Sequence, residues 1–122
     1  MHDAFLSQTK NLFGQKSTYL LACSGGMDSM CLASLLIKSQ IPFEIAHVNF
    51  QLRGKESDLD QKFVKNWAEN HQITFHTCNA STLELAESKG ISIQMAAREI
   101  RYRFFEEIRA KRGLNGIILA HH

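Results

Sequence analysis

The segment from residue 17 to residue 39 constrains the fold of this chain more than any other part of the sequence. The apolar run "STYLLAC" (17–23) is typical of a buried β-strand. The small residues "SGG" follow at 24–26, and apolar residues then cover much of the circumference of a helix from Asp28 to Ser39. The segment therefore predicts a buried strand, a tight turn and a well-buried helix in direct succession.

Strands and helices alternate along the rest of the chain. The predicted strands are 17–23, 43–50, 73–78 and 116–122. The predicted helices are 4–13, 28–39, one that opens at Ser57, a short one from Ser81 or Thr82 to Gly90, and a long one over about 92–111. This order predicts an α/β fold, with a Rossmann-like parallel sheet of four strands and helices on both faces. Ligands of such a sheet bind at the carboxyl ends of its strands.

Helical spacing also predicts which side chains are buried. Ser57 and Asp60 have the form of a capping box, so the helix there is expected to begin at Ser57. The residues expected in the core are Leu59, Phe63, Val64, Trp67 and Ala68 of that helix, Ile93, Ala97, Ile100, Phe104 and Ile108 of the long helix, and Tyr102, Cys23 and Cys31.

Composition and charge exclude several classes of protein. Hydrophobic residues make up 44% of the chain and charged residues 21%, so disorder is not expected, and the net charge of +2 is too small to indicate nucleic-acid binding by itself. The three cysteines form no C-x-x-C pair and no zinc-binding spacing, which points to a reducing compartment. The N-terminal segment carries Asp3 and lacks the apolar core of a signal peptide, and no apolar run approaches the roughly 20 residues of a membrane span. We expect a soluble, cytoplasmic protein of one domain.

The turn "SGGMDS" (24–29) has the features of a phosphate site. Adjacent Gly25 and Gly26 allow positive φ and close approach of a ligand. The first N–H groups of the following helix have no partner within it, and the hydroxyls of Ser24 and Ser29 can donate to the same anion. Asp28 can cap the helix or hold Mg²⁺. The alternative is a plain strand-to-helix turn, and the pattern matches neither G-x-x-x-x-G-K-[ST] nor G-x-G-x-x-G.

The same turn resembles the pyrophosphate loop of the PP-loop ATPases, or N-type ATP pyrophosphatases, which cleave ATP between the α- and β-phosphates. Three further segments are similar to the tRNA(Ile)-lysidine synthetase branch of that family. These are "AHVNFQLRGKESDLDQKFV" (46–64), "AAREIRYRFFEEI" (96–108) and "ILAHH" (118–122). Phe50 stands where many relatives have His, and the acidic stretch that follows A-H-H in that branch is not among the 122 residues. The resemblance implies an adenine nucleotide alpha hydrolase-like fold, with residues 1–122 as the N-terminal portion of a catalytic domain.

The resemblance also implies ligands and roles. ATP and Mg²⁺ are the expected cofactors, and free lysine and the anticodon loop of tRNA(Ile) are the expected partners. The residues expected to hold pyrophosphate are Ser24, Gly25, Gly26, Met27, Asp28 and Ser29, with Asp28 also on the metal. Arg98 and Arg101 are expected to act in catalysis on phosphate or adenylate. His47, Asn49 and His121 are expected to contact the nucleotide, and Arg53 phosphate or tRNA.

Several alternatives stay open at this level. The two arginines belong to a basic helix whose charges are solvated in most proteins. A single His in a strand, such as His47, is more often a hydrogen-bonded structural residue. His121 and His122 are adjacent in a strand and point to opposite faces, which disfavours zinc binding. Other functions consistent with the loop are a tRNA 2-thiolase, although paired cysteines are missing, and a domain that binds AMP or ATP without chemistry.

Overall fold

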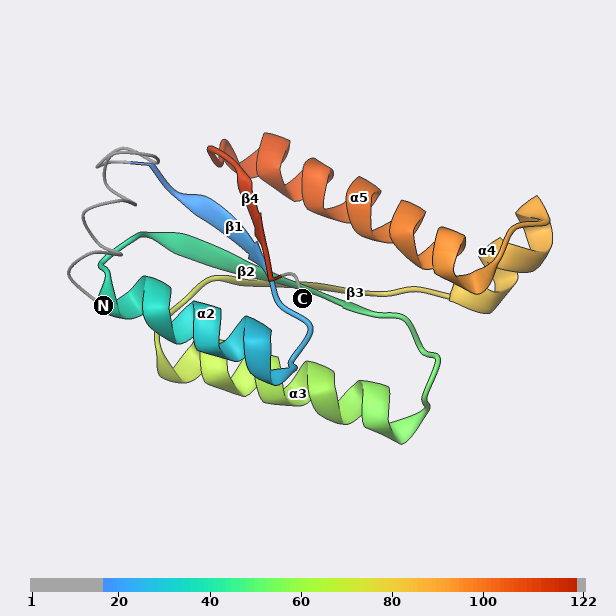
Figure 1. Ribbon diagram of the computed structural model, residues 1–122, viewed down its shortest axis with the longest axis horizontal. Helices are drawn as coiled ribbons and strands as arrows, with labels where there is room; N and C mark the ends of the chain where they lie inside the picture. Colours follow the sequence, from blue (N-terminus) through green and yellow to red (C-terminus); the bar gives the residue numbers. More distant parts are fainter. Residues whose placement is uncertain (1–16, 121–122) are drawn as a thin grey trace.

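Four parallel strands form the centre of the structure, a computed structural model that describes residues 17–120 (Figure 1). The strands are β1 (Tyr19–Ala22), β2 (Phe43–Asn49), β3 (Phe75–Asn79) and β4 (Ile117–Leu119). Their order across the sheet is β3-β2-β1-β4, and every neighbouring pair is parallel. The predicted α/β class and the parallel sheet are therefore confirmed, whereas the predicted helix 4–13 lies outside the described residues.

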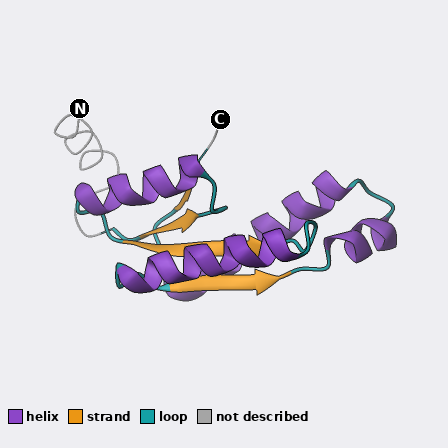
Figure 2. Cartoon of the chain, turned by 90° about the horizontal axis from the view of Figure 1, so that it is seen from below, coloured by secondary structure: helices purple, strands orange, loops and turns teal. Residues whose placement is uncertain are grey.

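Helices cover both faces of this sheet. They are α2 (Met27–Lys38), α3 (Lys55–Asn70), α4 (Thr82–Lys89) and α5 (Ile93–Arg112). Helices α2 and α3 lie side by side on one face, and α5 crosses the other face with α4 packed at its N-terminal end (Figures 1 and 2). Every residue of β2 is buried, because this central strand is covered on both sides. No helix between residues 17 and 120 has the length and apolar character needed to cross a membrane.

Local signals account for the ends of the last two helices. The Ser92 hydroxyl accepts a hydrogen bond from the backbone N–H of Met95 at 3.1 Å, which caps the start of α5. Gly90 ends α4 and Gly113 ends α5, each in the left-handed conformation that glycine adopts without a steric cost. The predicted bounds of these two helices are confirmed to within one residue.

The predicted capping box at Ser57 is wrong. Helix α3 begins at Lys55, and its N-cap is Gly54 with a φ of 56°. Ser57 therefore lies in the first turn, where its hydroxyl accepts a hydrogen bond from the N–H of Arg53 at 3.1 Å. A glycine with positive φ lets the chain turn into the helix earlier than the side-chain pattern suggests.

Several predicted core residues are exposed. On α3, Leu59 is 63% and Phe63 51% exposed, and the residues of this helix that are fully buried include Val64 and Ala68. On α5, Tyr102 is 57% exposed and Ile93 41%. Cys31 of α2 is also exposed, so this helix is less buried than expected. In each case the helix contacts the sheet along a stripe that is narrower than its apolar surface.

Candidate functional site

A cavity of about 500 Å³ opens at the carboxyl ends of the strands. Its walls come from the ends of β1, β2 and β4, from the two loops that enter α2 and α3, and from α5. The predicted site residues in its lining are Ser24, Ser29, His47, Asn49, Arg53, Arg98 and Arg101. The volume is in the range of small-molecule sites, and the position is where parallel sheets bind ligands.

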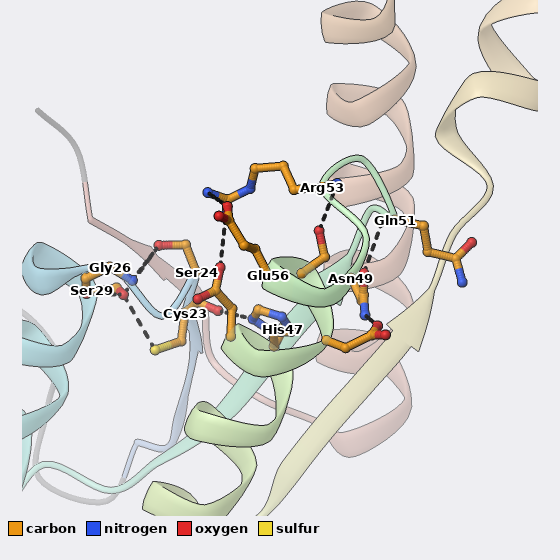
Figure 3. Close-up of polar contacts among 12 residues, drawn as sticks. Cys23, Ser24, Gly26, Ser29, His47, Asn49, Gln51, Arg53 and Glu56 are labelled. Carbon is orange, nitrogen blue, oxygen red and sulfur yellow. Dashed lines mark hydrogen bonds and ion pairs between the residues drawn. The ribbon is translucent and has the colours of Figure 1, made fainter.

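The β1–α2 loop forms one wall of this cavity (Figure 3). Gly25 has a φ of 92°, and a Cβ at this position would lie 3.4 Å from Cγ2 of Val64 on α3. Gly26 has a φ of −74°, so the predicted positive φ is confirmed for Gly25 and wrong for Gly26. The N–H of Gly26 donates to the Ser24 hydroxyl at 3.2 Å, and the Ser29 hydroxyl donates to the Gly26 carbonyl at 3.0 Å. The loop is thus held in shape by its own serines.

The loop presents hydroxyls to the cavity beside a helix N-terminus. Ser24 and Ser29 both line the cavity, and their Oγ atoms are 3.4 Å apart. Gly25 and Gly26 of the loop, and Met27 and Asp28 at the start of α2, are not part of the lining. The side chain of Met27 is 82% exposed, so any ligand contact from this residue would involve its backbone. Two hydroxyls next to the positive end of the α2 dipole form a surface suited to an anion.

His47 is buried in β2 and lines the floor of the cavity. Its Nδ1 lies 2.8 Å from the carbonyl oxygen of Cys23, and the residue is 4% exposed. Because a carbonyl oxygen only accepts, Nδ1 carries a proton, and Nε2 of the neutral ring is an acceptor. Burial lowers the pKa of His47, while the Cys23 carbonyl and the charge of Asp60 act in the opposite direction with smaller effect. The neutral ring is therefore favoured.

Asn49, at the end of β2, forms hydrogen bonds to other residues of the protein through its side-chain amide. Its Nδ2 donates to Oδ1 of Asp58 at 2.8 Å and to Oε1 of Gln61 at 3.0 Å. Its Oδ1 accepts from the N–H of Gln51 at 2.9 Å (Figure 3). The side chain thus fixes the β2–α3 connection at the rim of the cavity. A contact to nucleotide remains a prediction.

Arg53 is neutralised at the cavity edge. Its guanidinium lies 2.7 Å from Oδ2 of Asp60 and 3.5 Å from Oε2 of Glu56. Asp60 also lines the cavity, and its backbone oxygen lies close to Gly25. The pair joins the loop before α3 to that helix, so the charge of Arg53 is mostly balanced without a ligand.

Arg98 and Arg101 line the opposite wall, and their charges are not balanced. Within the described residues neither forms an ion pair. The Cζ of Arg98 lies 5.4 Å from the centre of the Tyr102 ring, and that of Arg101 lies 5.8 Å from the centre of the Phe50 ring. Two cations held on aromatic rings, facing a hydroxyl-lined loop, favour a ligand that carries phosphates.

The cavity includes residues that pattern reasoning did not select. The sequence pattern predicts Tyr102 in the core and indicates no role for Phe50, which departs from the related sequences, yet both line the cavity. The Arg-x-x-Arg-Tyr spacing could have indicated that Tyr102 lies at the site, because it puts Arg98 and Tyr102 on one face of a helix. Cys23 lines the cavity as well, and burial raises the pKa of its thiol.

The donor set at this site suits Mg²⁺ only where phosphates complete the coordination. Among residues 17–120 no group of three His, Cys, Asp or Glu is arranged to hold a metal. Asp28 is an exposed carboxylate in the first turn of α2, and Asp60 is paired with Arg53. One carboxylate is enough for Mg²⁺ when waters and phosphate oxygens supply the remaining ligands. His121 and His122 lie outside the described residues.

Comparison with known proteins identifies the family. The sequence profile of the PP-loop domain matches residues 1–122. The chain is 41% identical over 115 residues to a tRNA(Ile)-lysidine synthase of Bacteroides thetaiotaomicron, covering 94% of this chain and 27% of that protein. It is 36% identical over 115 residues to the tRNA(Ile)-lysidine synthase of Bacillus subtilis, covering 92% of this chain and 24% of that protein. The chain thus spans about a quarter of the length of these curated relatives.

A solved structure shares the fold. The NH3-dependent NAD synthetase of Campylobacter jejuni superposes with a TM-score of 0.70 at 17% identity, over 99% of this chain and 53% of that one. At this identity the likeness shows the architecture alone, and it confirms the predicted adenine nucleotide hydrolase-like arrangement. The profile match over the whole chain carries the assignment. The chain therefore belongs to the PP-loop ATP pyrophosphatase family of ATP-binding domains.

Proposed function

We propose that this chain is the N-terminal, ATP-binding part of a cytoplasmic tRNA(Ile)-lysidine synthetase. One observation carries the proposal at the level of the site. The hydroxyls of Ser24 and Ser29 and the unbalanced guanidiniums of Arg98 and Arg101 line one cavity from opposite sides of the sheet. The sequence identity to lysidine synthases over almost the whole chain supports the choice within the family.

The proposed reaction has two steps. In the first, O2 of the wobble cytidine attacks the α-phosphorus of ATP, the bond to the bridging oxygen breaks, and pyrophosphate leaves with the electron pair. In the second, the ε-amine of lysine attacks C2, the C2–O2 bond breaks, AMP leaves with that oxygen, and the nitrogen loses its extra protons. Both steps move charge onto phosphate oxygens, so the main task of the protein is to position the reactants and stabilise this charge.

The residues of this chain divide that task. Ser24 and Ser29, with the backbone of Gly25 to Asp28, would hold the departing pyrophosphate. Arg98 and Arg101 would stabilise charge at the α-phosphate. Nε2 of His47, an acceptor while the ring is neutral, suits a donor on the nucleotide such as the amino group of adenine. Asp28 would hold a Mg²⁺ ion, which neutralises phosphate charge when bound.

The test uses the complete gene product. It is incubated with ATP, Mg²⁺, lysine and an unmodified tRNA(Ile) transcript with a CAU anticodon, and the wobble nucleoside is analysed by mass spectrometry. We expect cytidine to gain the mass of lysine, and we expect Asp28→Ala and Arg101→Ala to abolish or strongly reduce the gain. Arg103→Ala is the matched control, because Arg103 lies on the same helix outside this cavity.

Two results would contradict the proposal. Cleavage of ATP to AMP and pyrophosphate without modified cytidine would point to another acceptor, such as the substrate of a tRNA 2-thiolase. Absence of ATP cleavage with retained nucleotide binding would point to a non-catalytic domain.

A further inference from the structure

The mouth of the cavity has a chemistry different from its floor. Leu52 is 42% exposed on the β2–α3 loop, and Tyr102 is 57% exposed on α5. Both line the cavity, as does Phe50 beneath the guanidinium of Arg101. The charged lining residues are three arginines and one aspartate, which is the aspartate already paired with Arg53. The exposed part of the lining therefore offers apolar and aromatic surface, and the lining as a whole carries a net positive charge.

Tyr102 is built as a stacking surface. Arg98 precedes it by one helical turn, and its guanidinium sits over the ring at 5.4 Å. Apart from this contact the described structure gives the Tyr102 side chain no hydrogen bond or ion pair, so polar interactions do not explain its exposed position. Nucleic-acid bases stack on Tyr rings and on guanidinium planes, and base stacking tolerates any base because each has a π-face.

We propose that Tyr102, supported by Arg98, stacks the RNA base that accepts AMP from ATP. The inference rests on the proposed function, and it names the part of the cavity where the RNA substrate lies. A base that reacts must leave its own stack to reach the α-phosphate, and an aromatic ring at the mouth compensates for the lost stacking.

The position of Tyr102 favours the acceptor base over the adenine of ATP. The buried acceptor of His47 lies at the sheet, on the floor of the cavity, and the loop that suits phosphates forms the adjoining wall. The Tyr102 ring lies on α5, more than half exposed to solvent. A base that arrives on a polymer from outside meets this ring first, whereas the small nucleotide fills the floor.

The experiment measures RNA binding by fluorescence anisotropy with the complete gene product, without ATP or lysine. The probes are the anticodon stem-loop of tRNA(Ile) with CAU and the same stem-loop with an abasic wobble position. We expect Tyr102→Ala to weaken binding of the intact stem-loop about tenfold and to leave binding of the abasic one unchanged. Tyr102→Phe keeps the ring and should bind like the wild type. Phe63→Ala is the matched control, because Phe63 is 51% exposed on α3 and does not line the cavity.

The test compares the effect of Tyr102→Ala on binding of the intact stem-loop with its effect on binding of the abasic stem-loop. An equal loss of affinity for both stem-loops, or no loss for either, would overturn the inference, because the wobble base would not be what Tyr102 contacts. An unchanged RNA affinity with a raised KM for ATP would assign the ring to adenine and also overturn it. Lysidine formation is scored separately by mass spectrometry. If lysidine forms but Tyr102→Ala has no effect on RNA binding, the inference alone is wrong. If Tyr102→Ala weakens binding only of the intact stem-loop and no lysidine forms, the proposed reaction alone is wrong. If the wild type does not bind the stem-loop, both are wrong.

Discussion

Gly25 is the residue on which the shape of the β1–α2 loop depends most. Its φ of 92° is unfavourable for any residue with a Cβ, although that atom would lie at ordinary contact distances of 3.4 Å from Val64 and 3.6 Å from Asp60. We expect Gly25→Ala to lower the free energy of unfolding by about 1–3 kcal/mol. The measurement is urea denaturation followed by fluorescence of Trp67, the single tryptophan of the chain.

Gly26 provides the matched control for that substitution. Its φ of −74° suits any residue, and an added Cβ would meet the Ser24 hydroxyl at an ordinary 3.4 Å. In Gly26→Ala, the loss of the N-cap glycine lowers the free energy of unfolding and the stiffer unfolded chain raises it. Each effect is below about 1 kcal/mol, so the two nearly cancel. Equal destabilisation by Gly25→Ala and Gly26→Ala would contradict the role assigned to the positive φ.

His47 makes the stability of the domain depend on pH. Burial lowers its pKa below 6.5 in the folded state, so the unfolded chain takes up a proton first as the pH falls. The stabilising contribution is complete above about pH 6.5 and is lost as the pH falls through the folded-state pKa. We expect the urea midpoint to fall between about pH 8 and about pH 5.5, and His47→Gln to flatten this change. The same slope in the variant, measured by circular dichroism, would assign the effect to other groups.

The connection between β2 and α3 depends on the amide of Asn49. Its two hydrogen bonds to α3 and its bond from Gln51 are made by a side chain that is 1% exposed. We expect Asn49→Ala to cost about 2 kcal/mol of stability, because buried partners lose their hydrogen bonds. Asn66→Ala, at an exposed position on α3, should cost almost nothing. If Asn49→Ala weakens ATP binding with no loss of stability, the residue contacts ligand and does not hold the loop.

Helix α5 is fastened to the sheet at its C-terminal end, far from the cavity. Arg112 donates to both oxygens of Glu44 at 3.0 and 2.9 Å, and Nε2 of His76 lies 2.7 Å from the same carboxylate. The hydrogen bonds from Arg112 are the main reason that the pKa of Glu44 lies below 4.5. Glu44 therefore stabilises the fold above about pH 4.5, and this contribution is lost as the pH falls further.

This pair predicts a pH-dependent mutational effect. Arg112→Ala should lower the Tm at about pH 7, and the difference from the wild type should shrink as the pH falls below about 4.5 and through the folded-state pKa of Glu44. Lys111→Ala removes a neighbouring positive charge that has no ion pair in the described part of the chain, and it should change the Tm little at either pH. A difference that stays constant with pH would mean that Arg112 acts through packing.

The elements differ in how far the sequence determined them. The strands, the end of α4 and both ends of α5 could be predicted because apolar runs, Gly90, Ser92 and Gly113 act locally. The start of α3 could not be predicted, because it depends on the positive φ of Gly54 and no side-chain pattern marks that conformation. The exposure of Phe63 and Tyr102 depends on how each helix is rotated against the sheet, and a broad apolar face is compatible with several rotations.

At the scale of the whole molecule, the cavity joins the two helical layers. The β1–α2 loop belongs to the layer of α2 and α3, and Arg98 and Arg101 belong to α5 on the other face (Figures 1 and 2). Local motifs predicted both halves of the site, but their meeting across the sheet edge follows from strand order β3-β2-β1-β4, which brings α5 over β1. A phosphate ligand in this cavity would contact both layers at once.

That arrangement predicts coupled protection on ligand binding. With ATP bound, we expect slower amide hydrogen exchange both in residues 24–29 and in the first half of α5, with little change in β3, which contributes nothing to the cavity lining. Arg101→Ala removes charge-assisted hydrogen bonds and should weaken ATP binding about tenfold, whereas Arg103→Ala should not. Because bound ligand stabilises the fold in proportion to RT ln(1 + [L]/Kd), the ATP-induced rise in Tm should fall in the first variant and persist in the second. Protection confined to residues 24–29 would mean that α5 does not reach the nucleotide, and it would remove the arginines from the ATP site.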